Sequence, residues 1–206
     1  MKTRSLAAFA FVVLAGAVPA VAQSSAQSGA LSKAVRKDAA AALAALDKND
    51  FSSAVERFEA AADAARKLQL QRVVRDVSAA TTSYRADGER LALAASSTLS
   101  FERFIRDRPV AEQILRDDKG DVVKLRVFGE GRDFEDFMFI AEDDDTLEQA
   151  GLERAVMAGE PALKKRGPNG QLSVLMMSEK DHALIEIEGD SEEAVMAVVS
   201  EIEAAK

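Results

Sequence analysis

The fold class is predicted most directly by residues 172–189, LSVLMMSEKDHALIEIEG. The first six residues are an apolar run that predicts a strand, and residues 178–182, SEKDH, predict a turn. The segment after the turn alternates with the two-residue period of a strand, which places Ala183, Ile185 and Ile187 on one face. The stretch therefore predicts an antiparallel hairpin, from which a sheet should extend towards earlier residues.

The residues before this hairpin predict an antiparallel meander with one face open to water. In residues 122–128, Val123 and Leu125 should face the core, whereas Lys124 and Arg126 should face solvent. Polar segments predict turns at 117–121 (DDKGD) and at 129–133 (GEGRD). The strands are expected at residues 97–105, which hold Leu99, Phe101 and Phe104, and at 110–117, 122–128 and 134–143, where Phe137, Phe139 and Ile140 are apolar.

Two later segments have helical spacing. Thr146 and Gln149 form a capping-box pattern for a helix within residues 143–159, and Asp190 and Glu193 form one for a last helix, 191–205. The apolar positions are Leu147, Leu152 and Val156 in the first helix, and Val195, Val199 and Ile202 in the second. Residues 90–206 are thus expected to form an α+β domain, an antiparallel sheet with helices on one face.

Residues 31–80 predict an antiparallel helical hairpin that precedes the sheet. Its first helix should run from Ser32 to about Leu46, before Asn49 takes a left-handed turn and Asp50 caps a second helix. We expect the second helix to bury one apolar stripe against the first. That stripe consists of Phe51, Val55, Phe58, Ala62 and Ala65.

The second helix also resembles part of a tetratricopeptide unit. Ala54, Phe58 and Ala61 occupy the small-large-small positions, and Phe51 occupies the aromatic start. No second copy follows about 34 residues later, and about three units are needed for an independent stack. A single hairpin is therefore expected, packed on the rest of the chain or on another subunit.

The N-terminus has the layout of a secretory signal peptide over residues 1–22. Lys2 and Arg4 precede an apolar run from Leu6 to Val18, and the small residues 20–22 form a cleavage site. That run is shorter than the ~20 residues that cross a bilayer, and no transmembrane span is expected in the mature chain. We expect the mature chain to begin at Gln23 with a flexible lead, 23–30, and to be periplasmic or secreted.

Composition narrows the possible functions. The chain has no cysteine, which excludes disulfides, thiolate zinc sites and a lipid-anchored cysteine. Its formal charge of −8 argues against nucleic-acid binding. With no tryptophan and one tyrosine, it also lacks the aromatic platforms on which glycosidases stack sugars.

No residues assemble into a recognisable catalytic, cofactor or metal site. His182 is the only histidine and is expected in an exposed turn. The acidic run Glu142, Asp143, Asp144 and Asp145 could hold a cation or could favour the positive end of a helix, and the second interpretation is preferred. The glycines of 129–133 are expected to join two strands, which gives no helix end for a phosphate.

The order of these segments resembles a group of small exported proteobacterial proteins of undefined function. The stretches that carry the resemblance are AALDKNDFSSAVERFEAAADAARKL (44–68), FERFIRD (101–107), GQLSVLMM (170–177) and ALIEIEGDSEEAVMAVVSEIE (183–203). The resemblance implies a helical hairpin before an antiparallel sheet domain, and an envelope location. It implies a chemical role for no residue.

The sequence therefore predicts an exported, soluble, non-catalytic binding or accessory factor of the cell envelope, with a protein or envelope component as its partner. One alternative is a carrier of a small apolar ligand, held between the sheet and its helices where Phe, Met and Ile converge. The other is an enzyme that uses carboxylates, with or without a bound metal.

Overall fold

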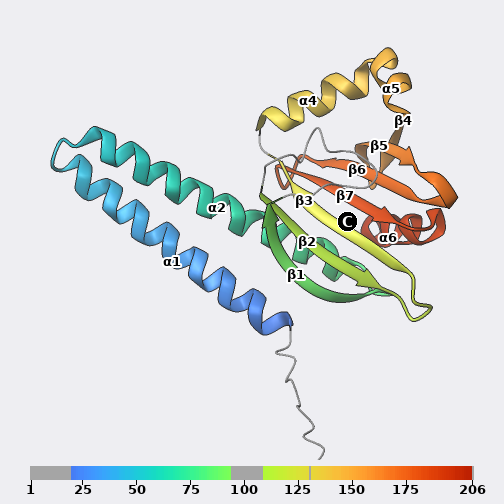
Figure 1. The fold of residues 1–206 in the computed structure, drawn as a ribbon, viewed down its shortest axis with the longest axis horizontal. Coiled ribbons are helices and arrows are strands. Elements are labelled where there is room, and N and C mark those ends of the chain that lie inside the picture. Colours follow the sequence, from blue (N-terminus) through green and yellow to red (C-terminus); the bar gives the residue numbers. More distant parts are fainter. Residues whose placement is uncertain (1–19, 94–108, 130, 206) are drawn as a thin grey trace, which may run out of the picture.

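The computed structural model describes residues 20–93, 109–129 and 131–205. They form two long helices, then an antiparallel sheet with further helices (Figure 1). The predicted α+β class is confirmed. The strand expected at 97–105 and residues 1–19 of the expected leader lie outside the described residues.

The two N-terminal helices, α1 (Ala20–Leu46) and α2 (Phe51–Ala80), form the predicted antiparallel hairpin. Asn49 is left-handed at the turn, with φ 58°, and Asp50 is the N-cap. The backbone N–H of Ser53 donates to Asp50 Oδ1 at 3.2 Å, and bonds from Ser53 hold the pKa of Asp50 below its ordinary value. The hairpin turn was thus predicted correctly.

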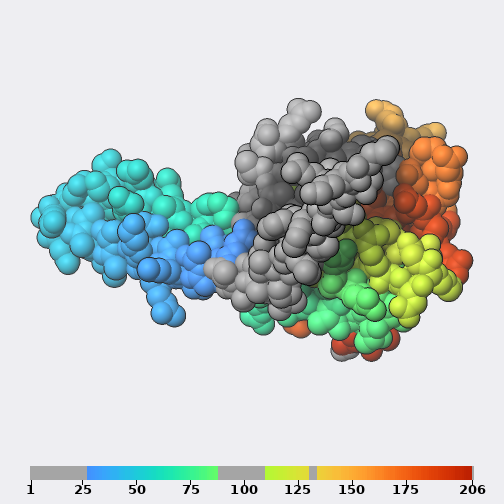
Figure 2. All heavy atoms as spheres, turned by 60° about the horizontal axis from the view of Figure 1, so that its bottom comes forward, coloured from blue at the N-terminus to red at the C-terminus, as the bar shows by residue number. Residues whose placement is uncertain are grey.

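The segment expected to be a flexible lead, residues 23–30, is helical because α1 begins at Ala20. The Ser28 hydroxyl donates to Gln71 Oε1 at 3.2 Å and accepts from Arg75 Nη2 at 3.0 Å. These bonds connect the start of α1 to the second half of α2, where α2 reaches the sheet. The two helices extend together from there, and their connecting turn lies far from the sheet (Figures 1 and 2). We call the hairpin of residues 20–64 the arm.

The arm is held together by alanine, which corrects the predicted interface. Ala42 on α1 and Ala54, Ala61 and Ala64 on α2 are buried, whereas Phe51, Val55, Phe58, Ala62 and Ala65 are exposed. Small side chains allow two helix axes to approach closely, so the alanine seam sets the contact. The large apolar stripe that we expected inside the hairpin is therefore outside it.

Seven strands form one sheet in the order β1-β2-β3-β7-β6-β5-β4, and all paired neighbours are antiparallel. The hairpin of β6 and β7 is confirmed, as are strands close to 110–117 and 122–128. The first strand and the two strands after residue 151 were not predicted. The strands are β1 (Arg85–Leu93), β2 (Pro109–Arg116), β3 (Val122–Phe128), β4 (Leu152–Met157), β5 (Glu160–Arg166), β6 (Leu172–Ser178) and β7 (Ala183–Gly189).

One face of the sheet is covered by the second half of α2 and by α6 (Glu192–Ala204). Val195, Val199 and Ile202 are buried there as predicted. A Cβ at Gly189 of β7 would lie 2.9 Å from Val195 Cγ2, so glycine allows the close approach of α6. Ser191 is the N-cap of α6, accepting from the Ala194 N–H at 3.1 Å, which corrects the predicted cap at Asp190.

The opposite face carries α4 (Gly131–Glu142) and α5 (Asp144–Ala150), where we expected a strand at 134–143. Phe134, Phe137, Met138 and Ala141 recur at helical spacing and pack on Phe128, Leu163, Leu175 and Leu184 of the sheet, while Phe139 points to solvent. Residues 129–133 therefore lead into a helix rather than joining two strands. Helix α4 carries the acidic residues Glu135 and Asp136 near this end, which disfavours an anion there.

The helix expected across 143–159 ends at Ala150, because Gly151 adopts the left-handed conformation with φ 63°. Strand β4 follows, and its Val156 is 76% exposed rather than on a buried helix face. Asp143 is the N-cap residue, and the Thr146 hydroxyl donates to it, so the predicted Thr146 capping box is wrong. A short 3-10 turn, η1 (Pro168–Gly170), joins β5 to β6.

Candidate functional site

The first candidate site is the outer side of the arm near its turn. Five large apolar residues there are each between 38% and 63% exposed. Two come from the end of α1 and three from the start of α2. We call this set the distal apolar side: Leu43, Leu46, Phe51, Val55 and Phe58.

Helix geometry places these residues on a single side of the arm. Successive helical residues turn by about 100°, so Leu43 and Val55 each lie one step past a buried seam residue. In two antiparallel helices that face each other, residues that are rotated by the same angle from the contact lie on the same side of the pair. Phe51 and Phe58 lie about 60° and 40° from Ala54 in that same sense. The five side chains therefore form one surface across both helices.

The other side of the arm is polar. Arg57, which lies on that side, donates to Asp38 Oδ1 on α1 at 3.2 Å. Residues 20–64 hold five Lys and Arg against six Asp and Glu, whereas residues 65–206 hold 20 against 29. The arm is thus near neutral on a chain whose remainder is strongly acidic, and a partner can approach it without strong repulsion of either sign.

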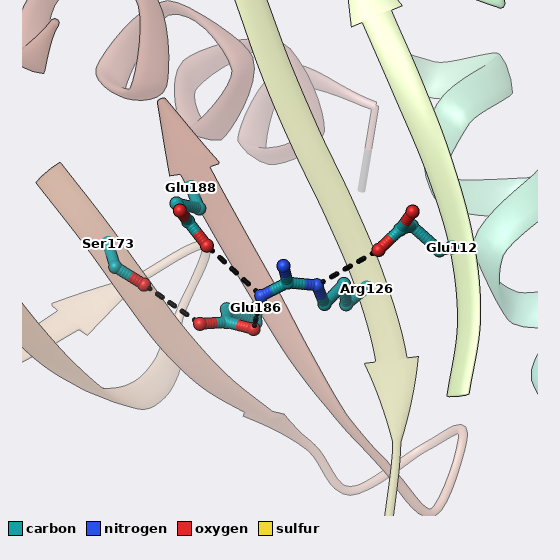
Figure 3. Close-up of polar contacts among 5 residues, drawn as sticks. All are labelled: Glu112, Arg126, Ser173, Glu186 and Glu188. Atoms are coloured by element: carbon teal, nitrogen blue, oxygen red, sulfur yellow. Dashed lines mark hydrogen bonds and ion pairs between the residues drawn. The ribbon is translucent and has the colours of Figure 1, made fainter. Parts of the chain in front are cut away.

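The second candidate is a cluster of charges inside the sheet (Figure 3). Arg126 of β3 lies between its register partners Glu112 of β2 and Glu186 of β7. Its Nε donates to Glu112 at 3.1 Å, and its Nη1 donates to Glu186 at 2.8 Å and to Glu188 at 3.0 Å. Arg126 is only 4% exposed, so the expectation that it faces solvent is wrong.

Burial and charge oppose each other in this cluster. Burial raises the pKa of Glu186 above its ordinary value, against the pull of Arg126. Burial also works against the charge on Arg126, yet Glu186, Glu188 and Glu112 outweigh it and raise the pKa of Arg126. A fully charged guanidinium on β3 therefore lies among carboxylates of the two neighbouring strands, β2 and β7.

The chemistry open to this cluster is limited by access. The Ser173 hydroxyl donates to Glu186 Oε1 at 3.2 Å, and neither residue has any exposed surface. A hydroxyl and a carboxylate closed to solvent offer no support for catalysis on an external substrate. The cluster instead fixes the register of β2, β3 and β7, since sliding any strand would leave a buried charge unpaired.

The third candidate is a cavity of about 540 Å³ between α4 and the β6–β7 turn. Its lining residues are Phe134, Glu135, Met138, Met177, Glu179 and His182. The surface is mostly apolar, and its polar groups belong to exposed residues. The cavity lies where the sequence suggested that Phe and Met side chains converge between the sheet and a helix.

The residues that the sequence suggested as functional candidates lie in different parts of the fold. His182 is exposed in the β6–β7 turn, as predicted, and lies beside the cavity. Met176 and Met177 are both buried, on opposite faces of the sheet. The structure does not bring His182 together with the acidic run 142–145 among the cavity residues.

The side chains of the acidic run, residues 142–145, interact with other residues of the chain. The Thr146 hydroxyl bond lowers the pKa of Asp143, and Asp144 pairs with Arg154 Nη1 at 2.5 Å. Asp144 and Asp145 lie in the first turn of α5, where they favour the positive end of the helix. Within the ranges that the structure describes, no group of three or more potential ligands is placed to hold a metal ion.

The sequence did not predict the charge cluster, and it predicted the other two candidates only in part. Arg126 and Glu186 each lie between two apolar residues in a strand, a pattern that favoured a solvent-facing position, and only the strand order brings them together with Glu112 and Glu188. A ligand site between the sheet and its helices was suggested, but the residues that line the cavity could not be named because residues 134–143 were interpreted as a strand. The distal apolar side was noticed as a stripe and assigned to the wrong side of the helix.

No protein-family model, no curated protein and no solved structure matches this chain. The resemblance to small exported proteins therefore stays a prediction. Across residues 20–93, 109–129 and 131–205, no helix is both long enough and apolar enough to cross a membrane.

Proposed function

We propose that this chain is an exported, soluble, non-catalytic binding factor of the cell envelope, which holds a protein partner against the distal apolar side of its arm. The observation that carries the proposal is the outward position of Phe51, Val55 and Phe58. Burying each such side chain is worth roughly 1.5–3 kcal/mol, and the hairpin forgoes that stabilisation. A partner that covers the side recovers it.

The arm has the shape and composition for this role. A helix of 27 residues such as α1 is about 40 Å long, so the turn at residues 47–50 extends well beyond the sheet. Apolar side chains that recur every three or four residues suit a helix-in-groove interaction. We infer that the partner presents an apolar helical face, which packs across both helices of the arm.

Export is supported by the leader-like N-terminus. Lys2, Arg4 and the apolar run Leu6–Val18 supply the features of a cleaved leader. N-terminal sequencing of the protein from an envelope fraction should find Gln23 as the first residue. Recovery of the protein in the cytosol with Met1 still attached would overturn this part of the proposal.

Site-specific photo-crosslinking in cells tests the partner. A photoreactive phenylalanine at position 51, 55 or 58 should give one and the same protein adduct. The same group at Ala60, which is exposed on another side of α2, should give none. Adducts of equal yield at position 60, or no adduct at the three apolar positions, would contradict the proposal.

The purified partner then allows a quantitative test. The double variant Phe51→Ser/Phe58→Ser should weaken binding by at least about tenfold, because two central apolar anchors are lost. The control Ala44→Ser/Ala60→Ser changes two exposed positions away from the distal apolar side and should leave the Kd unchanged. Equal affinities for both double variants would refute the assigned surface.

A further inference from the structure

The cavity beneath α4 is independent of the arm. We propose that it binds a small amphipathic molecule with an apolar chain and a cationic end. This second site goes beyond the proposed function, because the arm takes a protein and the cavity takes a small molecule. Its volume of about 540 Å³ lies within the range of small-molecule sites, about 300–1,000 Å³.

The floor of the cavity is apolar. Met177 is 5% exposed, and Phe134 and Met138 are partly buried against the same cluster of side chains. That cluster continues beneath them through Phe137 and Leu184, so the floor rests on a packed interior. Unbranched thioether side chains adjust their shape readily, so Met138 and Met177 can accommodate a flexible alkyl chain.

The rim of the cavity is acidic. Glu135, Glu179 and His182 are exposed, so their polar groups lie at the opening rather than in the floor. Among the lining residues that the structure describes, two carry a carboxylate and one carries an imidazole, so these side chains give the rim net negative charge. Lys180 is the nearest cation in sequence, and it is exposed and does not line the cavity. This charge attracts a cation and repels an anion.

The rim is also pre-organised. His182 has φ 47°, and its N–H donates to the Glu179 carbonyl at 3.3 Å, which closes the turn. The rings of Phe134 and His182 meet edge to face, with centroids 6.5 Å apart. The Ser178 hydroxyl donates to Asp181 at 2.8 Å within the same turn. A ligand therefore finds the opening largely formed, which lowers the entropic cost of binding.

Methionine methyl NMR provides a direct test with the full mature chain. The probes are n-octylammonium, n-octanol and octanoate, which share one chain length and differ in the charge of the end group. The ε-methyl signals of Met138 and Met177 should shift on addition of n-octylammonium. Those of Met157, Met176 and Met196, which pack on the other face of the sheet, should not.

Affinities separate the role of charge from the role of the apolar floor. Octanoate should bind at least about tenfold more weakly than n-octylammonium. Glu135→Gln/Glu179→Gln should remove that preference and leave n-octanol binding unchanged. The control Asp136→Asn/Glu142→Gln removes the same number of negative charges at exposed positions of α4 that do not line the cavity. This control should still bind n-octylammonium more tightly than octanoate.

Two results would overturn the proposal. If none of the three probes shifts Met138 and Met177, the cavity is not a binding site for such molecules. If octanoate binds as tightly as n-octylammonium, the assigned cationic end is wrong. Neither result bears on the arm, because photo-crosslinking at positions 51–58 is a separate measurement.

Discussion

Replacing Arg126 by methionine should destabilise the protein strongly. The substitution keeps an unbranched chain in the sheet and removes the guanidinium that Glu112, Glu186 and Glu188 contact at 3.1, 2.8 and 3.0 Å. Glu186 has no exposed surface, so water cannot replace the lost partner. Breaking a buried ion pair from one side costs about 3–5 kcal/mol.

The matched control is Arg116→Met on the neighbouring strand β2. Arg116 Nε pairs with Asp87 Oδ2 at 3.2 Å, but the two side chains are 50% and 64% exposed. An exposed pair is worth about 0–1 kcal/mol, so this variant should remain close to wild type. The two substitutions make the same chemical change, and burial is the main difference between them.

Urea unfolding and thermal melting measure the difference. About 3–5 kcal/mol corresponds to a fall in Tm of roughly 6–20 °C for a chain of this size. Arg116→Met should lower Tm by no more than about 4 °C. If Arg126→Met unfolds within about 1 kcal/mol of Arg116→Met, the cluster does not stabilise the sheet as the geometry indicates.

Three further predictions address other parts of the fold. Ala61→Leu should lower the free energy of unfolding by about 1–3 kcal/mol because it overpacks the alanine seam, whereas Phe58→Ser should change it by less than about 0.5 kcal/mol. A larger loss for Phe58→Ser than for Ala61→Leu in urea unfolding would refute the alanine seam. Ser191→Ala should lose about 1 kcal/mol of cap stabilisation, and Asp190→Ala should lose less in the same assay; an equal loss would assign the cap wrongly. Burial raises the pKa of Glu186 in the folded state, so the contribution of this carboxyl group to folding stability is fully present below the ordinary carboxyl pKa and is lost as the pH rises through the folded pKa. The urea midpoint should therefore fall over that pH range, and Glu186→Gln should make the fall less steep. An unchanged slope in the variant would exclude Glu186 as the cause of the fall.

The sequence was sufficient where local signals agree with the packing. The β6–β7 hairpin has apolar strands on both sides of a polar turn, and α6 has a single apolar stripe. The turn of the arm was also predictable, because Asn49 tolerates the left-handed conformation and Asp50 caps well. In each case the residues near the element determine its structure.

The sequence was insufficient where two local solutions compete. Helix α2 carries a stripe of large apolar residues and a stripe of alanines. The large residues are more hydrophobic, so the sequence predicted that they form the helix interface, whereas the alanines form it. Residues 134–143 are apolar over a short length, where helix and strand are difficult to distinguish from periodicity alone. Gly151 ended α5 and left room for β4, whose pairing depends on residues that follow it.

The candidate sites depended on contacts that are distant in sequence. Arg126 meets Glu186 only because β7 pairs with β3, and 60 residues separate the two in the chain. The cavity requires α4 to lie beside the β6–β7 turn, which no local pattern predicts. The exposure of the distal apolar side follows from a choice of helix interface, so it could be found only after the seam was known.

Thiol labelling can show which side of the arm is exposed, because the chain contains no cysteine of its own. Ala54 is 1% exposed and Val55 is 57% exposed, although they are adjacent in α2. In the folded protein without its partner, Val55→Cys should react with a thiol reagent about as fast as an unfolded peptide. Ala54→Cys should react at least about 100-fold more slowly, since its thiol becomes accessible only by local opening. A faster reaction at position 54 than at position 55 would mean that the large apolar residues are buried within the hairpin, and the binding surface proposed for the arm would not exist.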